Sequence, residues 1–380
     1  MMRGLTMRGL VRYVLFISFL VIPCIVVAQA GPQVQLSHTT ESLRGVSAVS
    51  RRVAWASGTH GTYLRTMDGG RTWIPAQVPD AGALDFRGVV AFSADEAFLM
   101  SAGPGEQSRI YHTSNGGTRW ELQFTNTNPK GFFDSIAFWD AKHGVVLGDP
   151  IPDESGKLKF EVLLTEDGQN WRAIPAARLP DAMEGEGAFA ASNSCLAIVA
   201  GGTDQNIWFA TGGKVARVFH SADRGLSWEV FDTPMVHGAD SAGIFSLAFR
   251  DALHGVIAGG DYKHPNGDGP NLAFTDDGGK TWTLSGLHPL AYFSAVTYDR
   301  KINEQAVLEA EVEKAMRVKG VLPQRIFIVG QDFVFDFRPP GNPRRISGKK
   351  KLGIGFNAAS AYPEGGALVV GPKGAIALIP

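Results

Sequence analysis

One short segment returns along the chain and constrains the fold more than any other feature. It reads TMDGGRTW at 66–73, TSNGGTRW at 113–120, SADRGLSW at 221–228 and TDDGGKTW at 275–282, with a shorter version, TEDGQNW, at 165–171. Successive copies of this box begin 47, 52, 56 and 54 residues apart. Such a period is typical of propeller blades and is too long for a simple array of hairpins. The repeat therefore predicts a ring of similar blades.

Each interval between boxes contains four short apolar strands in the same order. In the third and fifth units these strands are predicted at 135–139, 145–147, 160–164 and 171–174, and at 245–249, 256–258, 271–275 and 282–284. A turn joins the first two strands of a unit, and the box joins the last two. Short apolar runs separated by turn residues predict four-stranded antiparallel blades.

Counting strands gives seven units, because two follow the last box. Their strands are predicted near 293–298, 325–329 and 333–337, and near 356–361, 367–370 and 375–379. The last unit lacks a fourth strand, and the segment Val34 to Leu36 lacks a partner. Pairing the two closes the ring and removes an exposed edge. We predict an all-β, seven-bladed β-propeller closed by its N-terminal strand, with a short helical insertion at Lys301 to Gly320 in the sixth blade.

The box itself has the pattern of a structural turn. A hydroxyl residue is followed two positions later by Asp or Asn, whose side chain can accept N–H bonds from its own turn. A glycine supplies a positive φ, and the final tryptophan is expected to pack against a neighbouring blade. Asn115, which replaces the acid in the second box, can accept the same bonds. A catalytic group is not expected five times around a ring, so the boxes are predicted to build the fold.

The start of the chain has the pattern of a signal peptide. An arginine-rich segment precedes an almost wholly apolar run from Val14 to Val27, and Ala28-Gln29-Ala30 supplies small residues for cleavage. We expect residues 1–30 to be removed and residues 31–380 to form one domain that is periplasmic or secreted. The one remaining cysteine, Cys195, lies in an apolar run and is predicted to be a buried, inert thiol.

Charge and composition argue against several classes of partner. With 36 basic and 37 acidic residues, the chain has a formal net charge of −1 and no net basic field for nucleic acid. No cofactor or metal is predicted, because Asp261, His264 and Asp268 lie in a Gly- and Pro-rich loop and are too few for a convincing ligand set. The basic stretch at 344–351 is interpreted as solvated surface, with lipid headgroup contact as the alternative. We expect a monomer.

The binding site is predicted on the face of the ring opposite the boxes. The box and the first turn of each unit share one face, so the loops after the second and fourth strands share the other, which we call the loop face. These loops are the long ones, and long loops on a rigid frame often carry binding sites. They run over 125–134, 148–159, 176–187, 201–215, 232–243 and 259–270.

Acidic residues in or beside these loops, and arginines at strand starts on the same rim, are the candidate ligand-binding residues. They are Arg87, Arg109, Asp149, Glu184, Glu186, Arg217 and Asp261. One interpretation is that these charges pair with each other or with loop backbone. The other is a polar pocket at the channel mouth, in which arginines bind a carboxylate or phosphate and the acids bind hydroxyls or an amine.

At these motifs the chain resembles a known family. The boxes are similar to the Asp-box, or bacterial neuraminidase repeat. The chain after Gly31 resembles the photosystem II stability/assembly factor-like proteins of bacteria, especially at Gly148-Asp149-Pro150 and at 185–189. The resemblance implies a non-catalytic assembly factor that holds a protein. We therefore expect a protein or peptide partner in the cell envelope, bound on the loop face.

The alternative is a glycoside hydrolase acting on extracellular glycans. Sialidases and xyloglucan-cleaving enzymes are also Asp-box propellers, and such enzymes cleave with paired carboxyl groups. Sialidase activity is disfavoured, because no Arg-Ile-Pro stretch precedes the first box. For the other hydrolases, Asp149 with Glu186 or Asp261 would be the acid and the base.

Overall fold

The computed structural model describes residues 32–199, 205–286, 291–300, 325–330, 333–337, 344–348 and 355–380. The chain divides into two compact units, Met1–Ala30 and Gly31–Pro380. All described strands lie in the second unit. The predicted signal peptide and the predicted helix within 301–320 lie outside the described residues. Among the residues that are described, no helix has the length and apolar character needed to cross a membrane.

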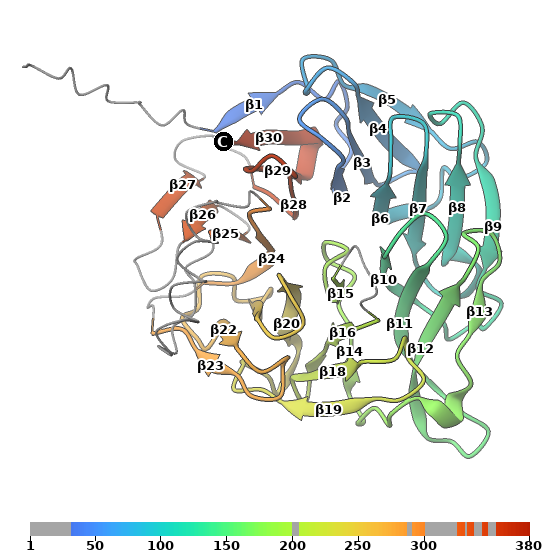
Figure 1. The fold of residues 1–380 in the computed structure, drawn as a ribbon, viewed down its shortest axis with the longest axis vertical. Coiled ribbons are helices and arrows are strands. Elements are labelled where there is room, and N and C mark those ends of the chain that lie inside the picture. The colour runs from blue at the N-terminus through green and yellow to red at the C-terminus, as the bar shows by residue number, and fades with distance from the viewer. Residues whose placement is uncertain are drawn as a thin grey trace, which may run out of the picture. The chain divides into compact units, whose positions relative to one another are not determined.

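Residues 31–380 form seven antiparallel sheets set around a central axis, which confirms the predicted seven-bladed propeller (Figure 1). Blade one contains β2 (Leu43–Ala48), β3 (Ala54–Gly58), β4 (Thr62–Thr66) and β5 (Ile74–Gln77). Blade two contains β6 (Asp85–Ala91), β7 (Ala97–Ala102), β8 (Arg109–Thr113) and β9 (Glu121–Thr125). Blade three contains β10 (Phe133–Phe138), β11 (Gly144–Pro152), β12 (Leu158–Thr165) and β13 (Arg172–Ala173).

Blade four contains β15 (Leu196–Ile198), β16 (Ile207–Ala210), β18 (Arg217–Ser221) and β19 (Glu229–Asp232). Blade five contains β20 (Ala239–Phe249), β21 (Gly255–Asp261), β22 (Leu272–Thr275) and β23 (Thr283–Leu284), and β20 is extended by β17 (Gly212–Gly213) and β14 (Glu186–Gly187). Blade six contains β24 (Phe293–Tyr298), β25 (Ile326–Gly330), β26 (Phe333–Phe337) and β27 (Arg344–Gly348). Blade seven contains β28 (Ala358–Ala361), β29 (Ala367–Gly371), β30 (Ala375–Ile379) and β1 (Gln33–Gln35). Three short 3₁₀ turns complete the described elements: η1 (Gly105–Gln107), η2 (Ala176–Arg178) and η3 (Pro372–Gly374).

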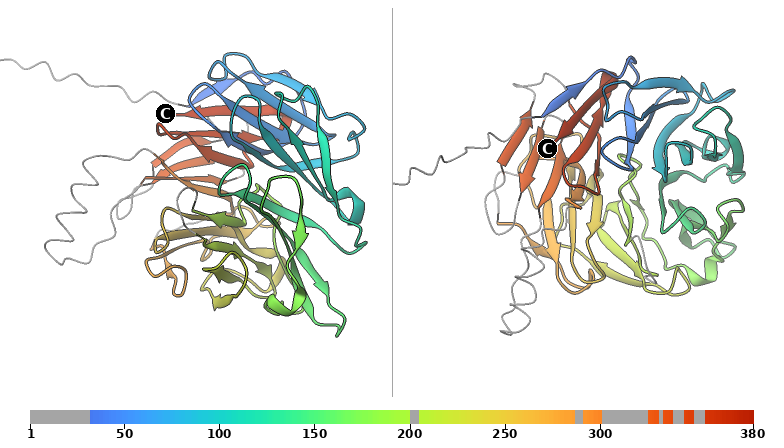
Figure 2. Two further views of the ribbon diagram at one scale, coloured as in Figure 1. Left: turned by 45° about the vertical axis from the view of Figure 1, so that its right-hand side comes forward. Right: turned by 45° about the horizontal axis from the view of Figure 1, so that its top comes forward.

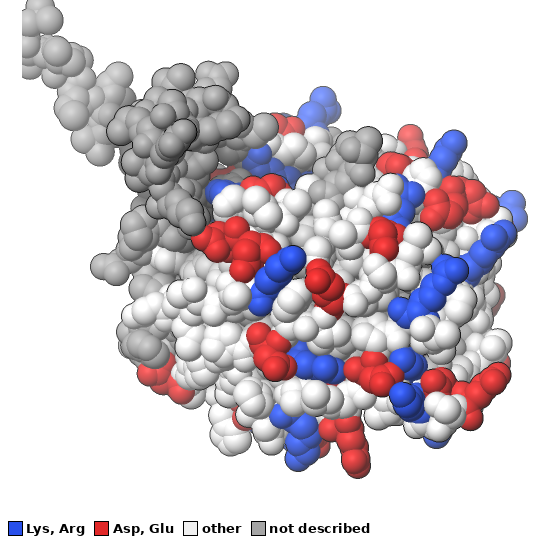
Figure 3. Space-filling model, turned by 60° about the horizontal axis from the view of Figure 1, so that its bottom comes forward, with Lys and Arg blue, Asp and Glu red and all other residues white. Residues whose placement is uncertain are grey.

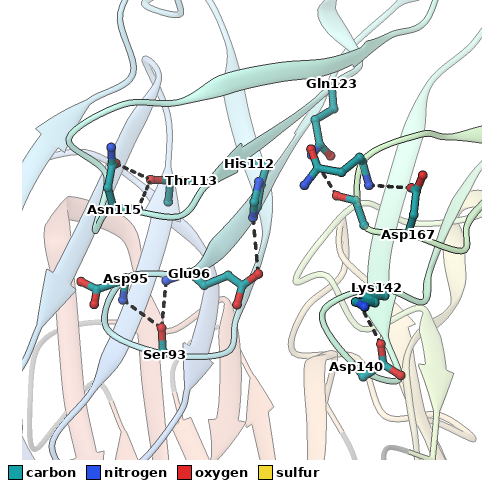
Figure 4. Close-up of polar contacts among 12 residues, drawn as sticks. Ser93, Asp95, Glu96, His112, Thr113, Asn115, Gln123, Asp140, Lys142 and Asp167 are labelled. Atoms are coloured by element: carbon teal, nitrogen blue, oxygen red, sulfur yellow. Dashed lines mark hydrogen bonds and ion pairs between the residues drawn. The ribbon is translucent and has the colours of Figure 1, made fainter.

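The boxes form the predicted turns and lie against the first turns of their blades. In blade one, Thr72 N–H donates to Asp68 Oδ1 at 2.9 Å and Gly70 N–H donates to Thr66 Oγ1 at 2.9 Å. In blade two, Asn115 Oδ1 accepts the equivalent N–H bond at 2.9 Å, as expected for an isosteric acceptor. Gly116 N–H also donates to the Asp95 carbonyl in the first turn, which places both turns on one face (Figure 4).

The box tryptophans pack against the preceding blade. Trp73 is only 1% exposed and lies in an apolar cluster with Leu368 of blade seven. Trp171 joins a cluster with Phe98 of blade two in the same way. This burial of apolar surface between sheets is the main source of stability expected for a ring of blades.

The closing strand is confirmed by its register. β1 pairs with β30 through Gln33↔Leu378, Val34↔Ala377 and Gln35↔Ile376, and the blue β1 lies beside the red β30 in Figure 1. Gln35 Oε1 accepts from Trp73 Nε1 at 2.9 Å, and its Nε2 donates to the Gly69 carbonyl at 3.0 Å.

The same pair of contacts recurs between blades two and three. There the outer strand of blade two follows the box of its own blade directly in the sequence. Gln123 Oε1 accepts from Trp171 Nε1 at 3.1 Å, and its Nε2 donates to the Gly168 carbonyl at 2.9 Å. Gln123 lies on β9, the outer strand of blade two. β1 therefore occupies the place of an ordinary outer strand, although it comes from the other end of the domain.

Some of the predicted long loops are strand in the structure. The segment 148–159 was expected to be a loop, but β11 and β12 continue into it as a hairpin with pairs such as Pro150↔Phe160 and Pro152↔Leu158. Figure 2 shows this green hairpin extending past the neighbouring strands. The segments 186–187, 212–213 and 239–243 likewise add strand at the inner edge of blade five. Glycine and proline interrupt the alternation of apolar and polar residues in these segments, so the sequence did not predict these strands.

Candidate functional site

The innermost strands deliver one side chain each to the mouth of the central channel. The register of five of these strands breaks near the start, between Leu43 and Gly45 in β2 and at the equivalent points of β6, β10, β20 and β24. A β-bulge of this kind leaves one residue unpaired and re-aims its side chain. The five bulged residues are Arg44, Arg87, Asp134, Phe245 and Ser294, and all of them line one cavity of about 470 Å³.

The residue after each bulge is small because the next blade packs against it. A Cβ atom on Gly45 would lie 3.0 Å from the Arg87 carbonyl oxygen, and one on Gly88 would lie 2.8 Å from Ile136 Cγ2. The bulges lie at the ends of the inner strands that are opposite the first turns. The cavity therefore opens on the loop face, at the channel mouth.

Aromatic rings form one wall of the cavity. Phe245 stacks on Phe189 with ring centroids 3.8 Å apart, and Tyr292 and Tyr262 meet Phe245 edge-on at 4.8 and 6.1 Å. Gly212 makes this stack possible, since a Cβ atom there would lie 2.3 Å from the Phe189 ring. Tyr262 remains 48% exposed and marks the rim.

Two carboxyl groups form a second wall. Asp134 is 1% exposed, and neither of its oxygens accepts a hydrogen bond of normal geometry from the described residues. Burial raises the pKa of Asp134 well above its usual range, and the nearby Asp149 raises it further, although Arg87 and the approaching Ala190 N–H oppose the shift. Burial also raises the pKa of Asp149 to about 6, although Asp149 Oδ1 accepts the Ala188 N–H at 3.0 Å.

Two guanidinium groups complete the lining. Arg87 is already engaged, because its Nε lies 2.8 Å from Asp85 Oδ2 and its Nη1 donates to the Ala190 carbonyl at 3.0 Å. Arg44 Nε is buried without a partner among the described residues. Burial lowers the pKa of Arg44, and repulsion from Arg87 lowers it further.

Of the predicted site residues, the structure brings Arg87 and Asp149 together in this cavity. Glu186 and Arg217 instead pair with each other, with Arg217 Nε 2.9 Å from Glu186 Oε1. The Glu186 carboxylate also accepts from Thr211 Oγ1 at 2.7 Å and from Met183 N–H at 2.8 Å, and its side chain is completely buried. This arrangement favours the structural interpretation of the pair.

The other three predicted residues lie outside the cavity lining. Arg109 Nε donates to the Glu106 carbonyl within its own loop. Asp261 is bound by its loop, with His264 Nδ1 2.7 Å from its Oδ2. Burial opposes the shift, but this contact and those from Ser241 and the Lys263 N–H lower the pKa of Asp261 to about 2. Glu184 is exposed on the loop that precedes β14.

Sequence reasoning missed Arg44, Asp134 and most of the aromatic wall. Arg44 and Asp134 are the bulged residues of β2 and β10. Phe189, Tyr262 and Tyr292 lie outside the strands, but only charged residues were taken as candidates. The available signal was a short pattern at or near the start of the first strand in six of the seven units: a large apolar residue, a variable residue and a small one. It reads LRG at 43–45, FRG at 86–88, FDS at 133–135, IFS at 244–246, FSA at 293–295 and FNA at 356–358.

The described residues contain no group of three or more His, Cys, Asp or Glu side chains arranged to hold a metal ion. Cys195 is fully buried, as predicted, and burial raises the pKa of its thiol well above the usual range. On the face displayed in Figure 3, acidic and basic side chains are interspersed, without a large patch of one sign. Recognition of a partner there would depend on local contacts more than on a long-range field.

The raised pKa of Asp149 predicts a pH-dependent stability. The folded state holds the Asp149 proton more tightly than the unfolded state, so stability is lost as the pH rises from about 4 through about 6. We expect Asp149→Asn to raise the free energy of unfolding by up to about 3 kcal/mol above pH 7 and by less than about 1 kcal/mol at pH 4. Denaturant titrations at several pH values measure this difference.

Asp153→Asn is the matched control, because hydrogen bonds from Ser155 are the main factor that lowers the pKa of this exposed acid. That variant should lose stability near neutral pH relative to the wild type. A gain in the free energy of unfolding for Asp149→Asn that did not change with pH would contradict the raised pKa of Asp149.

Comparison with known proteins places the fold among propellers. No family model matches the chain. The chloroplast photosystem II stability/assembly factor HCF136 of Oryza sativa subsp. japonica is 36% identical over 67 residues, which are 17% of this chain and 15% of that protein. A solved structure of YCF48 bound to D1 peptide is similar with a TM-score of 0.61 and 15% identity, covering 92% of this chain and 95% of that chain. The WD40 propeller domain of Doa1 gives a TM-score of 0.58 at 12% identity, covering 92% and 97%. The chain is thus similar to photosystem II assembly factors, in sequence over a short stretch and in fold throughout the propeller.

Proposed function

We propose that this propeller is a non-catalytic assembly scaffold that binds a segment of a partner protein at the channel mouth on its loop face. The observation that carries the proposal is the set of bulges, which brings a different side chain from each of five blades into one open cavity. The boxes repeat because they build the ring, whereas the five bulged residues are of four different types, two of them arginine, as expected if one ligand without the symmetry of the ring needs different contacts. YCF48, which shares the fold, binds a D1 peptide in its solved structure, and this supports a peptide partner here.

We extend the proposal to the location of the protein. The arginine-rich start, the apolar run and the small residues before Gly31 support export, with cleavage near Ala30. The partner would then be a protein of the cell envelope.

Site-specific photo-crosslinking in the cell that makes the protein tests the proposed binding face. A benzoylphenylalanine in place of Tyr262 lies at the rim of the cavity, and one in place of Met67 lies in a box on the opposite face. The two positions are similarly exposed, at 48% and 45%. We expect a discrete crosslinked partner from position 262 and none from position 67. Equal capture at both positions, or capture only at position 67, would place the binding surface elsewhere.

A glycoside hydrolase is the second candidate, and one observation favours it. The cavity contains two neighbouring carboxyl groups, Asp134 and Asp149, and burial raises the pKa of both. Glycoside hydrolysis needs an acid and a base or nucleophile of this type. Glu186 is a poor partner for Asp149 because Arg217, Thr211 and Met183 occupy its oxygens. The scaffold proposal predicts no sugar release from a glycan panel, and release that disappears in Asp134→Asn would replace it with the hydrolase.

A further inference from the structure

Among the described residues, the buried acid of the channel mouth has no ion-pair partner of its own. Asp134 is 1% exposed and lines the cavity, and neither of its oxygens accepts a hydrogen bond of normal geometry from the described residues, although the Ala190 N–H approaches it. A buried carboxyl group without partners is costly and is usually paired. The neighbouring cation, Arg87, already contacts Asp85 and the Ala190 carbonyl. Asp149, beside it, adds a second carboxyl group, whose Oδ1 accepts the Ala188 N–H.

The aromatic wall of the same cavity suits a cation. Tyr292 and Tyr262 stand nearly perpendicular to Phe245, at interplanar angles of 89° and 83°, so the rings form a corner. Aromatic faces attract ammonium and guanidinium groups, and the attraction grows when the site is shielded from water. Two carboxyl groups that line the same cavity as this corner are the elements of a site for a basic side chain.

The charges around the cavity favour a cation over an anion. The lining contains the guanidinium groups of Arg44 and Arg87 and the carboxyl groups of Asp134 and Asp149, and Asp85 adjoins it through its ion pair with Arg87. When all five groups are ionised, one negative charge is left over. Arg44 lies on blade one, whereas both carboxyl groups lie on blade three, and it interacts electrostatically with Tyr292. Its Nε, which has no partner among the described residues, can donate to a backbone carbonyl of the bound segment.

We propose that the channel mouth binds a lysine or arginine side chain of the partner, held between the Asp134–Asp149 carboxyl pair and the rings of Phe245, Tyr262 and Tyr292. The inference rests on the proposed function, because it specifies the chemistry of the segment that the loop face binds. A cavity of about 470 Å³ is within the range of small-molecule sites and accommodates such a side chain.

Capped seven-residue peptides that differ only at the central position test the inference on the purified protein. Arginine, citrulline and glutamate are placed there, because citrulline has the shape of arginine without its charge. NMR titration at millimolar peptide measures binding. We expect the arginine peptide to bind about tenfold more tightly than the citrulline peptide, and the glutamate peptide to bind no better than citrulline.

Variants assign the preference to the cavity. Asp134→Asn should abolish the difference between arginine and citrulline without lowering the melting temperature, because the amide keeps the shape of the buried group. Tyr262→Ala should weaken the arginine peptide severalfold. Asp95→Asn removes one exposed acid on the box face and should leave all three affinities unchanged.

Three results would overturn the inference. They are an arginine peptide that does not bind, equal affinity for arginine and citrulline, and a glutamate peptide whose tighter binding is lost in Arg44→Gln. If crosslinking at position 262 still captures a partner, any of these results rules out a basic side chain as the bound group but leaves the scaffold proposal intact. If crosslinking there fails as well, the proposed function fails with it.

Discussion

Replacing Arg217 with alanine is expected to lower the free energy of unfolding by about 3–5 kcal/mol, because it leaves a buried carboxylate without its cation. The Glu186 side chain is completely buried, and Arg217 contacts it through both Nε and Nη2. Arg217 Nη2 also donates to the Asp181 carbonyl at 3.1 Å, which ties the loop before β14 to blade four. Urea denaturation of the purified variant measures the loss.

The ring provides a matched control for this substitution. Arg109 is the first residue of β8, as Arg217 is of β18, so both begin the third strand of their blades. Arg109 donates to the Glu106 carbonyl near the surface, and we expect Arg109→Ala to cost less than about 1 kcal/mol. If the melting temperature of Arg217→Ala were unchanged while peptide binding was lost, the pair would belong to the binding site and not to the frame.

Trp73→Ala is expected to destabilise the domain by about 3–5 kcal/mol through the cavity that it leaves between blades one and seven. Trp73 is 1% exposed and packs with Leu368 and Ile376. Trp73→Phe should cost less, because it keeps most of the packing and removes only the bond from Nε1 to Gln35 Oε1. Calorimetric melting of both variants separates the two contributions.

The neighbouring residue supplies the control for Trp73. Ile74 is 52% exposed on β5, and Ile74→Ala should change stability by less than about 0.5 kcal/mol. Peptide binding at the channel mouth should survive in Trp73→Ala at temperatures where the variant is folded, since the box lies on the opposite face. A melting curve identical to the wild type would rule out a packing role for the box tryptophan.

The sequence was sufficient to predict the ring because its information is local and repeated. Each box gives its turn through contacts within a few residues, as between Thr66 and Asp68, and the spacing of the boxes gives the blades. The closing strand was also predictable, because one unit lacked a strand and one apolar segment lacked a partner. Proteins rarely leave the edge of a sheet exposed, so pairing the apolar segment with the incomplete unit was the arrangement that explained both observations.

The site was less predictable because it depends on pairing between distant residues. The sequence shows that Glu186 and Arg217 are charged, but not that a loop and a strand bring them together and bury both. Asp134 ends the predicted loop 125–134 but was not among the candidate residues, because the sequence does not show that a bulge at the start of β10 buries it in the cavity. A bulge cannot be read from alternation alone, so the direction of its side chain was also hidden.

The place of β1 in blade seven affects how this protein can be made. A ribosome produces Gln33 long before its partner Leu378, so β1 must wait until the strands of the other six blades have been synthesised before it can pair. Until then, the apolar cluster between blades one and seven has only half of its members, and Trp73 has no Leu368 to cover it. Blades two to five can assemble on nascent chain, whereas the join between the two ends is necessarily a late event. A cell that produces this propeller must therefore protect an open ring, with two unpaired edges, throughout translation.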